Sequence, residues 1–281
     1  MRRIAHISDL HFGRVDEGVA EALVHELNGG GFDLAVITGD FTMRARRKEF
    51  AAARAFLSRI EPPWVAVPGN HDISPYRLLQ RFLDPFRRYR RYVSTEVEPV
   101  WRDEEIAVFG LNTARRWAAE WNWSHGRISR DQIRRIEREI DGTPEGVFRI
   151  VFGHHPFLPP PWSPDERLVG RADEALASFE RRGVGLALAG HLHRGYSRFV
   201  KPVVSGETVV AALPSAPESA AGTRLLVAQA GSATSTRLRD EPNAYNRITV
   251  SHGRATIEVR LWTGDAWRTA EPARADAAGS S

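Results

Sequence analysis

Aspartate, asparagine and histidine side chains gather in five short clusters along this 281-residue chain. The clusters are Asp9-Leu10-His11, Gly39-Asp40, Gly69-Asn70-His71-Asp72, Gly153-His154-His155-Pro156 and Gly190-His191-Leu192-His193. Carboxylate, amide and imidazole groups are ligands for divalent cations. The chain has no cysteine, so a metal site in it would use nitrogen and oxygen ligands, which favours Mn, Fe, Zn or Mg over soft-ligand metals.

Each cluster directly follows a short apolar run that is typical of a buried β-strand. The predicted strands are Arg3–Ser8, Leu34–Thr38, Trp64–Val67, Phe148–Phe152 and Gly185–Ala189. Helical patterns separate them at Asp16–Asn28, Lys48–Ile60, Pro75–Tyr92 (broken at Pro85), Ser129–Ile140 and Ala172–Arg182. This alternation predicts a layered α/β fold. Ligands bind at the carboxyl ends of the strands in such sheets, so we expect the five clusters to meet at one edge.

Another strand, Ile106–Leu111, precedes a further candidate residue, Asn112. After Gly190 the pattern changes to short strands joined by turns, which predicts an antiparallel continuation that completes a second sheet. These strands are Arg194–Val200, Glu207–Ala212, Leu225–Ala230, Tyr245–Val250 and Ala255–Leu261. We find no linker and expect a single domain over residues 1–265, with a small helical cap insertion at 73–105. Residues 266–281 are predicted to be a disordered tail.

The composition is ordinary for a globular protein, with 42% hydrophobic and 26% charged residues. The net charge of +4 has two interpretations, a compositional bias toward arginine or attraction of anionic substrates. The stretch Phe86–Tyr92 (FRRYRRY) fits either a nucleic-acid contact or one packed aromatic face, and we favour packing. No secretory h-region or apolar run of membrane-spanning length occurs, so we expect a soluble, cytoplasmic protein without a membrane span.

Taken singly, each cluster is a common turn or cap, but the ordered set resembles the calcineurin-like metallophosphoesterases. Within them it is most similar to the bacterial class III cyclic-nucleotide phosphodiesterases. The resemblance implies a four-layer αββα sandwich and two divalent metal ions, with Mn or Fe favoured and Zn or Mg left open. One ion would be held by Asp9, His11, Asp40 and His193, and the other by Asp40, Asn70, His154 and His191. The family pattern Gly-His-x-Pro selects His154 rather than His155 as the ligand.

The chemistry implied by the resemblance is hydrolysis of a phosphoric ester by a metal-bound hydroxide. His71 would act as general acid or stabilise charge on the leaving oxygen, and Asp72 would orient His71 or brace its loop. Four further side chains are candidates for substrate contact: Arg44, Asn112, His125 and His155. The alternative is solvent exposure for Arg44, packing for His125, indirect support of the site for Asn112, and either packing or such support for His155.

A phosphodiesterase acting on nucleotide-like or other small substrates is the favoured function. A nucleotide-conjugate pyrophosphatase similar to UDP-diacylglucosamine hydrolase, and a phosphomonoesterase, are alternatives. From other classes we consider a binding scaffold without turnover and a nuclease. The scaffold is disfavoured because every ligand position and His71 are filled. Nucleic-acid partners are not expected, and a homo-oligomer is left open.

Overall fold

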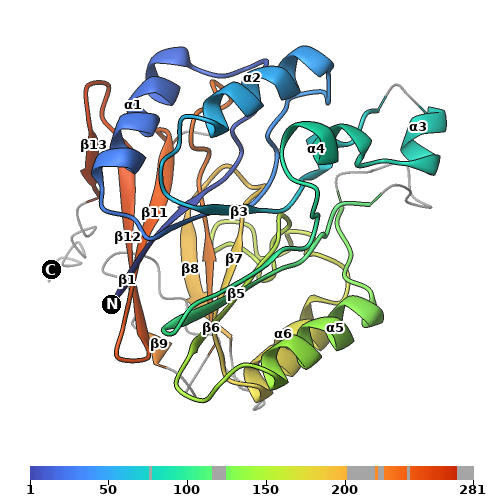
Figure 1. Ribbon diagram of the computed structural model, residues 1–281, viewed down its shortest axis with the longest axis vertical. Coiled ribbons are helices and arrows are strands. Elements are labelled where there is room, and N and C mark those ends of the chain that lie inside the picture. The colour runs from blue at the N-terminus through green and yellow to red at the C-terminus, as the bar shows by residue number, and fades with distance from the viewer. Residues whose placement is uncertain (76–77, 116–124, 201–218, 221–224, 239–240, 271–281) are drawn as a thin grey trace, which may run out of the picture.

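The computed structural model describes residues 1–75, 78–115, 125–200, 219–220, 225–238 and 241–270. Within them the chain forms two β-sheets packed face to face, with helices on both outer faces (Figure 1). The helices are α1 (Glu17–Gly29), α2 (Arg47–Leu57), α3 (Leu78–Leu83), α4 (Arg87–Tyr92), α5 (Arg130–Asp141), α6 (Ala172–Arg181) and the 3₁₀ helix η1 (Asn70–Asp72). The predicted four-layer αββα sandwich is therefore confirmed.

The first sheet has the strand order β13-β12-β11-β1-β2-β3, with β9 paired to β12. β1, β2 and β3 run parallel, whereas β11 pairs antiparallel with β1 and leads outward to β12 and β13. The strands are β1 (Arg2–Ile7), β2 (Leu34–Ile37), β3 (Trp64–Ala66), β9 (Ser219–Ala220), β11 (Ala244–Ser251), β12 (Arg254–Trp262) and β13 (Trp267–Thr269).

The second sheet has the strand order β4-β5-β6-β7-β10-β8. Its four central strands run parallel, and the two edge strands β4 and β8 are antiparallel to their neighbours. The strands are β4 (Val100–Arg102), β5 (Ile106–Gly110), β6 (Phe148–Phe152), β7 (Val184–Ala189), β8 (Tyr196–Phe199) and β10 (Leu226–Gln229). β4 was not predicted.

Alternation of side chains along β1 shows how the layers form. Ile4 points between the sheets, where it packs in a core shared with the second sheet, whereas Ala5 and Ile7 belong to the cluster under α1 and α2. Side-chain caps fix the helix starts: the Asp16 carboxylate accepts from Val19 N at 3.1 Å, and Ser129 and Gln132 form the predicted capping box of α5.

The late strands divide between the two sheets, which corrects the prediction that they complete the second sheet. β8 and β10 belong to the second sheet, but β11 and β12 extend the first sheet from β1. Hydrophobic alternation shows that a strand has a buried face and does not specify its partner. The predicted strand Glu207–Ala212 lies outside the described residues.

The structure also differs from the prediction at the disordered tail and at the cap insertion. β13 occupies Trp267–Thr269, so the tail predicted from residue 266 begins too early, and residues 271–281 lie outside the described part of the chain. Within the predicted cap, β4 is an edge strand of the second sheet.

α4 buries Tyr89, whose hydroxyl donates to Ala66 O at 2.9 Å, and Tyr92 stacks on Phe50. The aromatic residues of this helix therefore pack, as favoured, while α3 extends from the sandwich (Figure 1).

No helix among the described residues has the length and apolar character needed to cross a membrane.

Candidate metal centre

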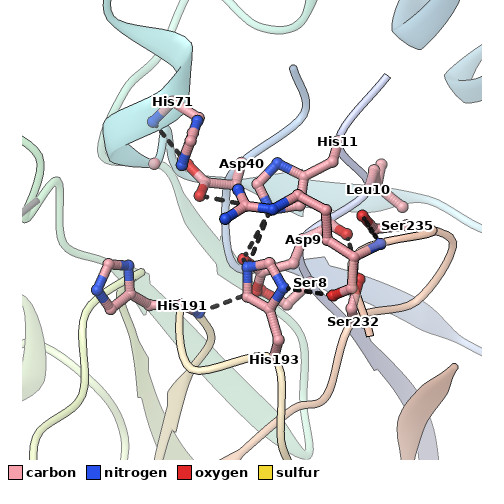
Figure 2. Close-up of polar contacts among 12 residues, drawn as sticks. Ser8, Asp9, Leu10, His11, Asp40, His71, His191, His193, Ser232 and Ser235 are labelled. Carbon is pink, nitrogen blue, oxygen red and sulfur yellow. Dashed lines mark hydrogen bonds and ion pairs between the residues drawn. The ribbon is translucent and has the colours of Figure 1, made fainter. Parts of the chain in front are cut away.

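The loops that follow β1 and β7 bring three side chains to a common point. His11 Nε2 lies 3.1 Å from His193 Nε2, and Asp9 Oδ1 lies 3.4 Å and 3.3 Å from these two nitrogens. Figure 2 shows the three side chains pointing toward one another. All three are buried, so the arrangement is a polar cluster at the edge of the sandwich where the parallel strands end.

A second group of side chains converges on His154, which follows β6. Its Nε2 atom lies 3.1 Å from Asn70 Oδ1, 3.3 Å from Asp40 Oδ2 and 3.3 Å from His191 Nδ1. Asp40 Oδ2 is also 3.8 Å from His11 Nε2, a member of the first group. The Asp40 carboxylate therefore lies between the two groups, and all seven side chains predicted as ligands are brought together.

The backbone of this region is left-handed at residues that are not glycine. Positive φ angles of 51° to 79° occur at Asp9, His11, Asp40, His191 and His193. Such a backbone is uncommon for aspartate and histidine and costs conformational energy. Five residues of one cluster adopt this conformation. This indicates a site where the direction in which the side chains point is maintained despite the energetic cost to the backbone.

Two glycines allow the loops to approach the carboxylates closely. A Cβ atom on Gly69 would lie 2.0 Å from Asp40 Oδ1, and one on Gly190 would lie 1.8 Å from Ser8 Oγ. Ser8 donates to Asp9 Oδ2 at 2.6 Å, so both glycines border groups that hold the acidic ligand candidates. A side chain at either position would displace part of the cluster.

Backbone carbonyls orient the imidazole rings. His154 Nδ1 donates to Thr38 O at 2.6 Å, and His193 Nδ1 donates to Arg237 O at 3.1 Å. In each neutral ring the other nitrogen, Nε2, then carries a lone pair that faces the cluster. This is the arrangement by which proteins fix histidine ligands for a metal.

The donor set fits divalent cations. Neutral His154 turns its lone pair toward the oxygens of Asn70 and Asp40, a contact between acceptors that a cation or a proton must bridge. Asp9 Oδ1 is buried and accepts no hydrogen bond within the described part of the chain. Nitrogen and oxygen atoms in this geometry are suitable ligands for first-row divalent metals or Mg.

The pKa values of the clustered side chains reflect their burial and their mutual contacts. Burial opposes ionisation of Asp40, but the neighbouring imidazoles outweigh it and hold the pKa of its carboxyl well below the usual range. Burial lowers the pKa of His154, whereas the charge of Asp40 dominates and raises that pKa to about 9. Burial, together with His154, lowers the pKa of His191 to about 3. The cluster thus combines anionic carboxylates with imidazoles whose charge depends on their neighbours.

His71 lies beside the first group and points its ring at the site. Its Nδ1 atom donates to Met43 O at 2.7 Å, and its ring meets His11 edge to face with centroids 5.0 Å apart. The neighbouring backbone is tied to the cluster because His71 N donates to Asp40 Oδ1 at 2.9 Å. His71 is therefore next to the ligand candidates without being one of the groups that converge.

Asp72 is buried and joins the loops after β2 and β3. Its carboxylate accepts from Gly69 N and Thr42 N, both at 3.0 Å, from Phe41 N at 3.3 Å and from Thr42 Oγ1 at 3.1 Å. Burial and the charge of Asp40 raise the pKa of Asp72 to about 7. The hydrogen bonds from Phe41 and Thr42 link the loop that carries His71 to the loop after β2.

The four candidates for substrate contact have different surroundings. The Arg44 side chain is exposed, and Asn112 Oδ1 accepts from Ala114 N at 3.1 Å and so turns its own loop. His155 is buried, and its Nδ1 is 2.7 Å from Thr113 Oγ1. His125 is half-buried and precedes Gly126, which packs on the His155 ring. Of the four, His155 lies against the cluster, with its ring centroid 4.9 Å from that of His191.

Several residues that hold the site were not predicted. Thr38, Met43 and Arg237 contribute carbonyl oxygens, and Ser232 Oγ donates to Asp9 O at 2.8 Å. Of these four residues, only Thr38 has a feature in the sequence that points to the site, because it ends a predicted strand. A carbonyl group is common to every residue, so sequence alone does not mark the ones that orient a histidine.

Comparison with known proteins agrees with the geometry. The family model described as Calcineurin-like phosphoesterase matches residues 2–195. The 3',5'-cyclic adenosine monophosphate phosphodiesterase CpdA of Escherichia coli (strain K12) is 29% identical over 170 residues, 58% of this chain and 55% of its own length. A probable glycerophosphodiester phosphodiesterase GpdQ of Arcobacter nitrofigilis is 23% identical over 124 residues, 44% of this chain and 42% of its own. The chain spans about half the length of the curated relatives it matches.

The fold is also shared with a solved structure. Purple acid phosphatase PPD1 from yellow lupin seeds superimposes with a TM-score of 0.71 at 12% identity, covering 96% of this chain and 53% of that one. At this identity the likeness concerns the fold alone.

Proposed function

The chain belongs to the calcineurin-like phosphoesterase family, and we propose that it hydrolyses phosphoric esters with two divalent metal ions, preferring small phosphodiesters. The observation that carries the proposal is the convergence of two groups of imidazole and carboxylate atoms that share Asp40. The names of the relatives, a cyclic-nucleotide and a glycerophosphodiester phosphodiesterase, support the preference for diesters.

The proposed ligands follow the two groups. Asp9, His11, Asp40 and His193 would hold one ion, and Asp40, Asn70, His154 and His191 would hold the other. Imidazole with hard oxygen ligands favours Mn or Fe, and Zn or Mg also suits such a set. When bound, two such ions supply Lewis-acid stabilisation of a phosphoryl group and an acidified water.

His71 supplies the proton in this proposal. Its Nδ1–H is held by Met43 O, which fixes the ring and leaves Nε2 to face the bound ester. In the imidazolium form Nε2–H donates a proton to the oxygen that leaves phosphorus, so the departing alkoxide does not have to form as a free anion. Asp72 keeps the loop of His71 against the loop after β2 through its four hydrogen bonds.

Pyrophosphate cleavage in a nucleotide conjugate and hydrolysis of monoesters are alternatives within the same chemistry. A binding scaffold without turnover is the alternative from another class. The filled ligand positions and the oriented His71 favour catalysis. A cytoplasmic location is part of this proposal, as the sequence predicts.

The test is a substrate panel after controlled metal loading. The protein would be stripped with a chelator, loaded with Mn, Fe, Zn or Mg, and assayed with cyclic AMP, bis(p-nitrophenyl) phosphate, p-nitrophenyl phosphate and a nucleotide pyrophosphate. We expect metal-dependent turnover that is fastest on a diester. Equal or faster monoester turnover would contradict the diester preference, and binding of two metal ions without turnover of any ester would favour the scaffold.

A further inference from the structure

Arg237 connects two parts of the metal centre that are far apart in the sequence. Its carbonyl oxygen accepts from His193 Nδ1 at 3.1 Å, and its amide donates to Ser235 Oγ at 3.0 Å. Its guanidinium Nη1 lies 3.7 Å from Met43 Sδ, on the loop after β2. The side chain therefore begins beside a ligand candidate and ends on the opposite loop.

The end point of this side chain is the residue that orients His71. Met43 O accepts from His71 Nδ1 at 2.7 Å. Between the two ends lies His11, whose ring centroid is 4.8 Å from that of His193 and 5.0 Å from that of His71. Three imidazoles thus form a row, and the Arg237 side chain spans from the first of them to the loop that holds the last.

The charge of Arg237 is left available for an anion. Among the described residues no carboxylate forms an ion pair with its guanidinium, which is exposed and contacts the thioether sulfur of Met43, a weak acceptor. Arg194, the residue after His193, differs because its Nε is paired with Glu241 Oε1 at 3.0 Å. A guanidinium held at its base and unpaired at its tip is suited to bidentate binding of phosphate oxygens.

We propose that Arg237 binds the non-bridging oxygens of the substrate phosphoryl group, a role that rests on the proposed function. Arg237 would draw a monoanionic phosphodiester toward the row of imidazoles formed by His193, His11 and His71, where the leaving oxygen must reach the proton donor His71. Its carbonyl would at the same time keep His193 oriented, a contribution of the main chain that substitution of the side chain leaves in place.

The test uses Arg237→Met, which removes the charge and keeps an unbranched chain, and Arg237→Lys, which keeps the charge without the bidentate fork. Arg54→Gln is the matched control, since Arg54 is an exposed arginine on α2 without an ion pair among the described residues. The affinity of each manganese-loaded protein for inorganic phosphate would be measured by calorimetry, together with metal content, kcat and KM on bis(p-nitrophenyl) phosphate.

We expect Arg237→Met to weaken phosphate binding and lower kcat/KM by about tenfold or more, with metal content unchanged. The phosphate affinity and kcat/KM of Arg237→Lys should lie between those of the wild type and of Arg237→Met. Both quantities should be unchanged in Arg54→Gln. Phosphate affinity of Arg237→Met within twofold of the wild type, or a wild type that binds no phosphate at millimolar concentration, would overturn the proposal.

The two proposals fail separately. A wild type that hydrolyses no ester but loses phosphate binding on Arg237→Met would refute the proposed activity and support this anion site. A wild type that hydrolyses diesters and is unaffected by Arg237→Met would support the activity and refute the anion site.

Discussion

His11 Nε2 and His193 Nε2 face each other at 3.1 Å, although 182 positions separate the two residues in the chain. Asp9 Oδ1 lies within 3.4 Å of both nitrogens. The His193 ring is fixed by a hydrogen bond from Nδ1 to a carbonyl, so its lone pair points at its neighbour. Two imidazole nitrogens and a buried carboxylate directed at one point form the arrangement expected around a cation.

His71→Ala is expected to lower kcat on a phosphodiester by about 10²–10⁴-fold, because it removes the proton donor for the leaving oxygen. Metal content should stay at the wild-type level, since His71 is not among the converging ligand atoms. Steady-state kinetics and elemental analysis on the same sample check both statements. Near-normal turnover with both metals bound would remove His71 from the mechanism.

Gly69→Ala is expected to destabilise the protein by about 1–3 kcal/mol and to weaken metal binding, because the new Cβ would lie 2.0 Å from Asp40 Oδ1. Gly142→Ala is the control: Gly142 follows α5, and its Cβ would meet nothing closer than 3.5 Å. Urea unfolding and metal titration of both variants would measure the difference. The expectation is wrong if the two substitutions have equal effects.

His6 gives the protein a dependence of stability on pH. Its Nδ1 accepts from Asn246 Nδ2 and its Nε2 donates to Thr38 Oγ1, both at 3.1 Å, so the buried ring is neutral. Burial lowers its pKa to about 3, below the value of about 6.5 expected in the unfolded chain. The unfolded state therefore binds this proton more readily, and the stability contributed by His6 is complete above pH 6.5 and lost as the pH falls toward 3.

The comparison of wild type with His6→Gln isolates this contribution. Below pH 6.5 the free energy of unfolding of the wild type should fall relative to the variant by about 1.4 kcal/mol per pH unit. Urea unfolding at pH 7.5, 6 and 5 measures it, and the other titrating groups cancel in the difference. A constant difference across these pH values would mean that His6 titrates normally in the folded protein.

Local patterns in the sequence predicted a layered α/β fold and the edge at which the polar residues meet, whereas the four-layer sandwich was implied by the family resemblance. Arg3–Ser8 and Leu34–Thr38 were placed within one residue of β1 and β2, and their clusters follow directly. The pairing of β11 with β1 was not predicted, since alternation is the same whichever strand lies alongside. The contacts of Arg237 with His193 and Met43 were not predicted either. They join three loops that are far apart in the sequence, and no sequence motif links these loops.

Metal stoichiometry of the wild type and Asp40→Asn tests the central claim most directly, with exposed His25→Ala as control. Asp40 lies between both groups of ligand atoms, so its loss should affect both ions. The account predicts two equivalents of a divalent metal and diester hydrolysis in the wild type and His25→Ala. In Asp40→Asn it predicts fewer than two equivalents with activity largely lost. Two tightly bound metal ions and undiminished hydrolysis in Asp40→Asn would contradict it.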